Sequence, residues 1–144
     1  MSIEIKVIRL HENAIIPTKA HDDDAGYDLF AAGDARVSPG QSALIPTGIA
    51  IALPPMTEAQ IRPRSGLALR ERVTVLNTPG TIDAGYRGEI GVILINHGDS
   101  DFIVARGMKI AQMVISRVLD TRLSEVSKLD DTQRGGGGFG STGV

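Results

Sequence analysis

The sequence predicts an all-β sandwich or barrel, because its composition favours strands and turns. The apolar residues are rich in isoleucine and valine, whereas aromatic residues make up 3% and tryptophan is absent. β-Branched side chains favour pleated, half-buried strands. The 17 glycines and 7 prolines can supply the turns that many short strands require. Many short strands joined by turns are typical of a sandwich or barrel.

Length and charge limit the class of protein. At 144 residues the chain is expected to form one domain. No apolar run approaches the ~20 residues that cross a bilayer, and charges interrupt the first ten residues, so neither a membrane span nor a signal peptide is expected. The net charge of −2 argues against nucleic acid and membranes as partners. The absence of cysteine excludes disulfides and thiolate metal sites and favours a cytoplasmic location.

Short apolar runs between turn residues predict the strands in order. Isoleucine and valine alternate with charged residues over residues 3–10, which predicts the first strand. Pro39 and Gly40 suit the centre of a type II turn, so a hairpin is expected between a strand around Val37 and one over residues 42–46. Further strands are expected over residues 25–32, 48–53, 58–62, 73–76, 90–96, 102–104 and 109–118.

One helix and one flexible segment complete the predicted organisation. Residues 65–72 have a helical composition, with Ser65 as the expected N-cap. Residues 130–144 are glycine-rich and contain almost nothing that could enter a core. The sequence therefore predicts a β domain over residues 1–129 and a flexible C-terminal arm over residues 130–144.

The arm carries residues that suit a nucleotide. Arg134 offers a guanidinium fork for phosphate, Phe139 can cover a base, and the hydroxyls of Ser141 and Thr142 can donate to phosphate oxygens. The glycines between them offer backbone N–H groups for an anion. Fully extended, the arm reaches about 50 Å at about 3.3 Å per residue. A plain flexible terminus is the alternative interpretation.

Two further clusters contain residue types that suit ligand binding or catalysis. Arg64 leads into the expected helix start, where free N–H groups favour a phosphate; an ordinary N-cap beside a surface arginine is the alternative. Turn residues at both ends of the segment 77–89 predict a hairpin that presents Asp83 and Tyr86 near its arms. An aspartate that only caps a turn and a tyrosine that belongs to the core are the alternatives there.

Polar residues inside apolar strands require partners. Asp28 lies in the middle of one such strand, so a nearby arginine is expected to pair with its carboxylate. Gln112 lies in another, and a buried amide needs hydrogen bonds. The chain has no P-loop or dinucleotide fingerprint, and its three histidines lack metal-site spacing and are expected to be exposed.

Five segments resemble, in order and spacing, the five motifs of the trimeric deoxyuridine triphosphatase (dUTPase) family. They are AGYDLFAA at 25–32, PRSGLALR at 63–70, GTIDAGYRGEIGVILIN at 80–96, RGMKIAQMVI at 106–115 and RGGGGFGSTG at 134–143. The resemblance implies a distorted jelly-roll, or β-clip, subunit with one short helix and a flexible arm. It also implies a homotrimer whose active sites lie between subunits.

The same resemblance implies a hydrolase that converts dUTP to dUMP and pyrophosphate, which limits uracil incorporation into DNA and supplies dUMP for dTMP synthesis. Asp83 would activate the water that attacks the α-phosphorus in line. Mg²⁺ would be held by the substrate phosphates and water, with no direct protein ligand and with indirect support from Asp28. The implied substrate-binding residues are Arg64, Ser65, Gly66, Asn77, Gly80, Thr81, Ile82, Tyr86, Met108, Gln112, Arg134, Phe139, Gly140 and Ser141.

Two other functions can be weighed against this one. A deoxycytidine triphosphate deaminase shares the fold but needs an additional acid–base glutamate in the base pocket, where this chain has Asp83, Ala84, Gly85 and Tyr86. A nucleotide-sensing module could dispense with Asp83 or the arm, yet both are present. The resemblance therefore favours the hydrolase.

Overall fold

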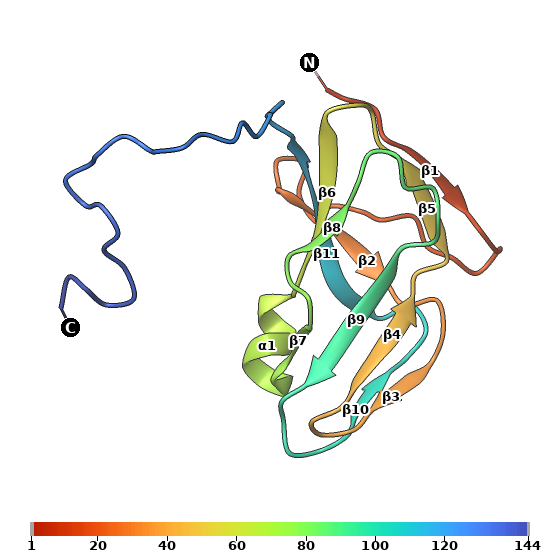
Figure 1. Cartoon of the computed structure of the whole chain (residues 1–144). Helices are drawn as coiled ribbons and strands as arrows, with labels where there is room; N and C mark the ends of the chain where they lie inside the picture. The colour runs from red at the N-terminus through yellow and green to blue at the C-terminus, as the bar shows by residue number, and fades with distance from the viewer. Residues whose placement is uncertain (1, 144) are drawn as a thin grey trace.

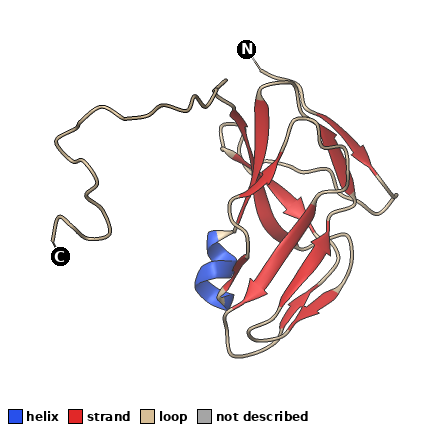
Figure 2. Ribbon diagram, viewed as in Figure 1, coloured by secondary structure: helices blue, strands red, loops and turns tan. Residues whose placement is uncertain are grey.

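The computed structural model describes residues 2–143 and shows an all-β architecture with one short helix (Figure 1 and Figure 2). The predicted fold class is confirmed. In chain order the elements are β1 (Lys6–Arg9), β2 (Gly26–Phe30), β3 (Ala35–Val37), β4 (Ser42–Pro46), β5 (Ile49–Ala52), β6 (Thr57–Arg62), α1 (Ser65–Glu71), β7 (Val73–Val75), β8 (Gly80–Ile82), β9 (Gly91–Asn96), β10 (Phe102–Val104) and β11 (Lys109–Arg117).

Two larger sheets enclose the core. One has the strand order β2-β11-β6-β8 and the other the order β4-β9-β7, while β1 pairs with β5 and β3 with β10. Buried and less buried residues alternate along β6 and β9, as expected for strands with one face in the core. Leu29, Ile45, Val92, Leu94 and Ile110 are almost completely buried in the core. This packing fixes the outer face of the four-stranded sheet, which carries the charged residues described below.

The turn at residues 38–41 forms as predicted, but the hairpin does not. Gln41 donates its backbone N–H to the Ser38 carbonyl at 3.0 Å, and Gly40 has the positive φ of 76° that a type II turn requires. However, β3 pairs with β10 and β4 pairs with β9. The turn therefore carries the chain from one sheet to another, because turn chemistry specifies a reversal and not the partner of each strand.

The predicted hairpin over residues 77–89 is wrong for the same reason. The strand before Asp83, β8, pairs with β6, whereas β9, which follows the turn, pairs with β4 and β7. The intervening turn is closed by a hydrogen bond from the Tyr86 N–H to the Asp83 carbonyl at 3.1 Å. Asp83 and Tyr86 thus lie at a corner between two sheets.

Element ends also differ from prediction. The first strand is shorter than residues 3–10, and the helix begins at Ser65 instead of being capped by it. Arg64 occupies the N-cap position with extended backbone angles and makes no side-chain cap hydrogen bond. Placing Ser65 inside the first turn brings Arg64 to the junction between β6 and α1, where its side chain can turn back over the sheet.

Residues 118–143 leave the body of the protein and contain neither helix nor strand (Figure 1, blue trace). Most of them are exposed. The division between a domain at 1–129 and an arm at 130–144 stays a prediction, and Met1 and Val144 lie outside the described residues. No helix within residues 2–143 has the length and apolar character needed to cross a membrane.

Candidate active site

The tertiary structure brings together three of the polar clusters found in the sequence. Asp28, Arg64, Ser65, Gly66 and Gln112 line one pocket of about 190 Å³, named here the charged pocket. Asp28 and Gln112 are register partners in neighbouring strands β2 and β11. Arg64, Ser65 and Gly66 reach the same place because β6 also pairs with β11 and leads directly into α1.

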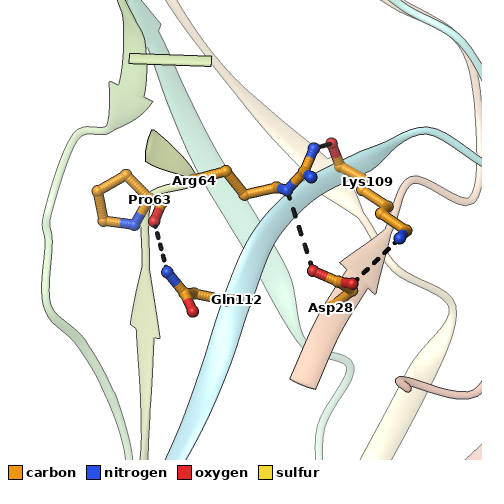
Figure 3. A network of polar contacts seen from close by, with 5 residues as sticks. All are labelled: Asp28, Pro63, Arg64, Lys109 and Gln112. Carbon is orange, nitrogen blue, oxygen red and sulfur yellow. Dashed lines mark hydrogen bonds and ion pairs between the residues drawn. The ribbon is translucent and has the colours of Figure 1, made fainter. Parts of the chain in front are cut away.

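Asp28 is held between two cations. Its Oδ2 atom lies 3.2 Å from Lys109 Nζ and its Oδ1 atom lies 3.9 Å from Arg64 Nε (Figure 3). The side chain of Asp28 is 18% exposed, so the two cations compensate a largely buried charge. The expected arginine partner is confirmed, although Lys109 is nearer. One carboxylate against two cations leaves net positive charge beside the pocket, which favours an anionic ligand.

Gln112 has the partner that its position demanded. Its Nε2 atom donates to the Pro63 carbonyl at 3.0 Å (Figure 3). Gly26 lies against the other end of the amide, and a Cβ atom added there would overlap Gln112 Oε1. The absence of a side chain at Gly26 therefore leaves room for Gln112 Oε1, while the hydrogen bond to Pro63 holds Nε2.

A second pocket of about 230 Å³, named here the turn pocket, surrounds the corner between β8 and β9. Its buried lining residues are apolar or glycine, whereas Asn77, Thr81 and Asp83 are exposed. It brings together six of the predicted residues, Asn77, Gly80, Thr81, Ile82, Asp83 and Tyr86, with Ile61, Val75, Glu89, Ile90, Gly91 and Ile93.

Tyr86 is part of the turn and not of the core. Its ring is 48% exposed, and its hydroxyl donates to the Glu89 carbonyl at 2.8 Å. The side chain lies over Gly88, where an added Cβ atom would overlap the Tyr86 hydroxyl. Arg87 fastens the same turn, because its Nη1 atom donates to the carbonyls of Ala84 at 2.6 Å and Tyr86 at 3.1 Å. The interpretation of Tyr86 as a core residue is therefore wrong.

The two pockets lie apart on one chain. Within residues 2–143, no residue lines both of them. Ile82 is the register partner of Ala59 in antiparallel strands, so Asp83 is level with Glu58, and Arg64 follows Glu58 by six residues, just after the end of β6. At about 3.3 Å per residue this places the backbone of Asp83 roughly 20 Å from that of Arg64 along the strand direction.

The family model for dUTPase matches residues 12–143. The chain belongs to the dUTPase family. It is 63% identical over 142 residues to a deoxyuridine 5'-triphosphate nucleotidohydrolase of Gloeothece citriformis, covering 99% of this chain and 98% of the relative. It is also 63% identical over 139 residues to the Clostridium tetani protein of the same name, covering 96% of each chain.

Solved structures agree with the family. The dUTPase of Staphylococcus bacteriophage 80alpha with dUPNHPP superimposes with a TM-score of 0.92 at 27% identity, covering 99% of this chain and 100% of that chain. A point mutant of the dUTPase from phage phi11 of S. aureus, described with a structural Mg(II) ion, gives a TM-score of 0.82 at 26% identity, covering 88% of this chain and 98% of the other. The fold is thus the jelly-roll-like β fold of the dUTPases.

The arm motif of the dUTPase family lies away from both pockets. Arg134 donates from Nε to the Gly137 carbonyl at 2.8 Å, within the arm itself. Phe139 is fully exposed, and neither Gly140 nor Ser141 lines either pocket. Met108 is also absent from both linings; its carbonyl accepts a hydrogen bond from the Ala31 N–H at 2.8 Å. The structure leaves the predicted roles of these five residues as predictions.

Sequence reasoning missed Lys109, although Lys109 makes the shortest ion pair to Asp28. Lys109 and Gln112 are three positions apart, so simple strand alternation places them on opposite faces. The register between β11 and β2 shifts between Lys109 and Ala111, and this irregularity brings Lys109 onto the face of Gln112. The one signal in the sequence was the opposite charge of Lys109 and Asp28. Gly26 and Arg87 were missed because their roles depend on contacts that spacing does not show.

Proposed function

We propose that this member of the dUTPase family is a dUTP diphosphatase, which cleaves dUTP to dUMP and pyrophosphate. The observation that carries the proposal is the assembly of the family's motif residues into a charged pocket and a turn pocket. The two relatives at 63% identity are named for this nucleotidohydrolase activity. Such a reaction would limit the uracil available for DNA and supply dUMP for dTMP synthesis.

In the proposed mechanism, Asp83 acts as the general base. Asp83 is exposed at the rim of the turn pocket and has no ion-pair partner among residues 2–143. Its carboxylate can accept a hydrogen bond from water and take the proton as the water oxygen bonds to the α-phosphorus. The bond from the α-phosphorus to the bridging oxygen breaks on the opposite side, and pyrophosphate leaves with that electron pair.

The charged pocket is proposed to bind the phosphate chain. Arg64 supplies a positive charge there, Ser65 a hydroxyl and Gly66 a backbone without a side chain. Gln112 presents an amide already held by Pro63. These groups position the phosphates and compensate their charge, which is most of what phosphoryl transfer requires.

Magnesium is the proposed cofactor, and the donor set of the charged pocket limits how it is held. No group of three or more histidine, cysteine, aspartate or glutamate side chains that could hold a metal exists among residues 2–143. Of the described residues that line this pocket, Asp28 alone carries a carboxylate, and both its oxygens face cations. The residues fit a Mg²⁺ bound through phosphates and water, with Asp28 accepting from those waters. The ion would neutralise charge on the phosphates.

The turn pocket is proposed to select the base and the sugar. The backbone and side chains at Asn77, Gly80, Thr81 and Ile82 would pair with uracil and leave no room for the methyl group of thymine. Gly80 lies so close to Asn77 that an added Cβ atom would be 3.2 Å from Nδ2. Tyr86 would pack against the deoxyribose and exclude a 2′-hydroxyl. Fixed polar groups reject a mismatched base because they would be left without partners.

A homotrimer with active sites between subunits is part of the proposal. The separation of about 20 Å between Asp83 and Arg64 along the sheet, at about 3.3 Å per residue, supports completion of each site by a second copy. The arm leaves the body of the protein (Figure 1) and none of its described residues lines either pocket, which supports its closing over a site elsewhere. In that arrangement Arg134 and Ser141 would reach the γ-phosphate and Phe139 would cover uracil. A cytoplasmic location and the lack of nucleic-acid or membrane partners remain predictions.

The direct experiment is to incubate the protein with Mg²⁺ and, separately, dUTP, dTTP, dCTP and UTP, and to separate the products by chromatography. Formation of dUMP and pyrophosphate from dUTP alone is expected. Deamination of dCTP would replace the proposal with the deaminase. Binding of dUTP without turnover of any nucleotide would indicate a nucleotide sensor.

A further inference from the structure

Lys109 contacts both charged residues of the charged pocket, yet it does not line the pocket itself. Its ammonium lies 3.2 Å from Asp28 Oδ2, and its backbone carbonyl accepts a hydrogen bond from Arg64 Nη1 at 3.4 Å (Figure 3). The contact between Asp28 and Arg64 is longer, at 3.9 Å. Lys109 therefore contacts the Asp28 carboxylate through its ammonium and the Arg64 guanidinium through its carbonyl.

A local departure from regular strand geometry aims Lys109 at Asp28. Lys109 is the register partner of Phe30, and Phe30 lies on the same face of β2 as Asp28, two residues away. The register shift between Lys109 and Ala111 makes this possible, since without it Lys109 would face away from Gln112. β-Bulges of this kind commonly re-aim a side chain beside a functional site.

The environment makes these contacts stronger than ordinary surface pairs. The side chains of Asp28, Arg64 and Lys109 are 18%, 33% and 43% exposed, whereas the surface pair of Arg36 and Asp101 is 69% and 42% exposed. Less exposed charges are less screened by water and ions. Without the Lys109 ammonium, the ion pair left to Asp28 within residues 2–143 would be the one with Arg64 at 3.9 Å.

We propose that Lys109 is a positioning residue of the charged pocket: its carbonyl orients Arg64 toward a polyphosphate, and its ammonium orients the carboxylate of Asp28 toward the waters of the magnesium ion that would accompany it. The inference rests on the proposed binding of the phosphate chain in this pocket. It assigns no contact between Lys109 and the reacting atoms. The effect of Lys109 should therefore depend on the phosphates beyond the first and pass through Asp28.

The test compares Lys109→Met, which removes the charge and keeps the length, with Lys109→Arg, which keeps the charge. Binding of the nonhydrolysable dUPNHPP and of dUMP is measured by calorimetry, with and without Mg²⁺, so the result does not depend on turnover. For Lys109→Met we expect about tenfold weaker binding of dUPNHPP, less than twofold weaker binding of dUMP and a lower kcat, and Lys109→Arg should restore most of each loss.

Two controls test whether the effect is specific to the charged pocket and passes through Asp28. Arg36→Met breaks an ion pair of the same type on β3 and should change neither ligand's affinity. In an Asp28→Asn background, Lys109→Met should weaken dUPNHPP binding by less than threefold, because the partner is already gone.

An equal loss of dUPNHPP and dUMP affinity together with a lower melting temperature would show a purely structural role and overturn the inference. Unchanged dUPNHPP binding in Lys109→Met would also overturn it. If Lys109→Met does not fold, the double-mutant comparison is made with Lys109→Gln. Wild-type protein that binds dUPNHPP but does not hydrolyse dUTP would contradict the proposed function without deciding the role of Lys109.

Discussion

The charged pocket draws its side chains from distant parts of the chain, whereas the turn pocket comes, apart from Ile61, from one stretch between Val75 and Ile93. In the charged pocket, ion pairs and an amide hydrogen bond hold the functional groups. In the turn pocket, hydrogen bonds from side chains to backbone carbonyls and close glycine contacts set the shape of the turn. The two pockets should therefore respond differently to substitution: the first through ligand charge and the second through ligand shape.

The largest effect is expected for Asp83→Asn. Asp83 lies in the turn pocket, but its proposed task is to take a proton from water, which asparagine cannot do. We expect kcat to fall by about 10²–10⁴-fold while dUPNHPP affinity stays within a few fold. Pyrophosphate release and calorimetry measure the two quantities. Persisting turnover would show that another group activates the water.

Removal of residues 130–144 is the next largest change, because it leaves both pockets intact and takes away the arm. We expect kcat/KM for dUTP to fall about a hundredfold through the loss of the Arg134 donor. Stability should change by less than about 0.5 kcal/mol, since the arm is exposed and lies off the body. A clearly lower melting temperature would place the arm inside the folded unit and contradict the predicted boundary at residue 129.

In the charged pocket, Gly26→Ala tests how strongly dUPNHPP binding depends on the orientation of the Gln112 amide. The added methyl group would overlap Gln112 Oε1, so the amide must move away from Pro63. We expect about tenfold weaker binding of dUPNHPP, which corresponds to about 1.4 kcal/mol. Gly33→Ala is the matched control, because an added Cβ atom there meets nothing within 4 Å. Equal effects of the two substitutions would exclude the proposed role of Gly26.

The smallest effect is expected for Gly88→Ala, beside Tyr86 of the turn pocket. The added methyl group would displace the Tyr86 ring, which is half exposed and can swing outward at little cost. We expect the preference for dUTP over UTP, taken as the ratio of kcat/KM values, to fall about fivefold. Gly85→Ala, with open space around the added atom, should leave the preference unchanged. If the preference holds in Gly88→Ala, Tyr86 does not exclude the ribose hydroxyl.

The sequence predicted local structure well where residues close together in the chain determine the backbone conformation. The type II turn at Pro39 and Gly40 forms because that pair of residues suits it, and most strands lie within a few residues of their predicted positions. Asp28 and Gln112 could be singled out because polar groups in apolar strands need partners. The resemblance to the dUTPase family was also available in the sequence, and the family comparisons confirm it.

The sequence could not predict which strands pair with one another. Turn residues predicted hairpins at residues 38–41 and within 77–89, but not that each segment joins two different sheets. Strand alternation alone would place Lys109 on the face opposite Gln112, because a register shift depends on both paired strands and cannot be read from either alone. The separation of the charged pocket from the turn pocket likewise follows from the pairing of β8 with β6.

The sequence by itself therefore determined the fold class, the family and the chemical types of the functional residues, because composition, local turn preference and motif order are properties of neighbours along the chain. Only the tertiary structure decided that Lys109 and Arg64 share Asp28, that Gly26 leaves room for Gln112, and that Asp83 lies away from the charged pocket of its own chain. These relations depend on strand register, and register is settled when residues far apart in sequence bury one common core.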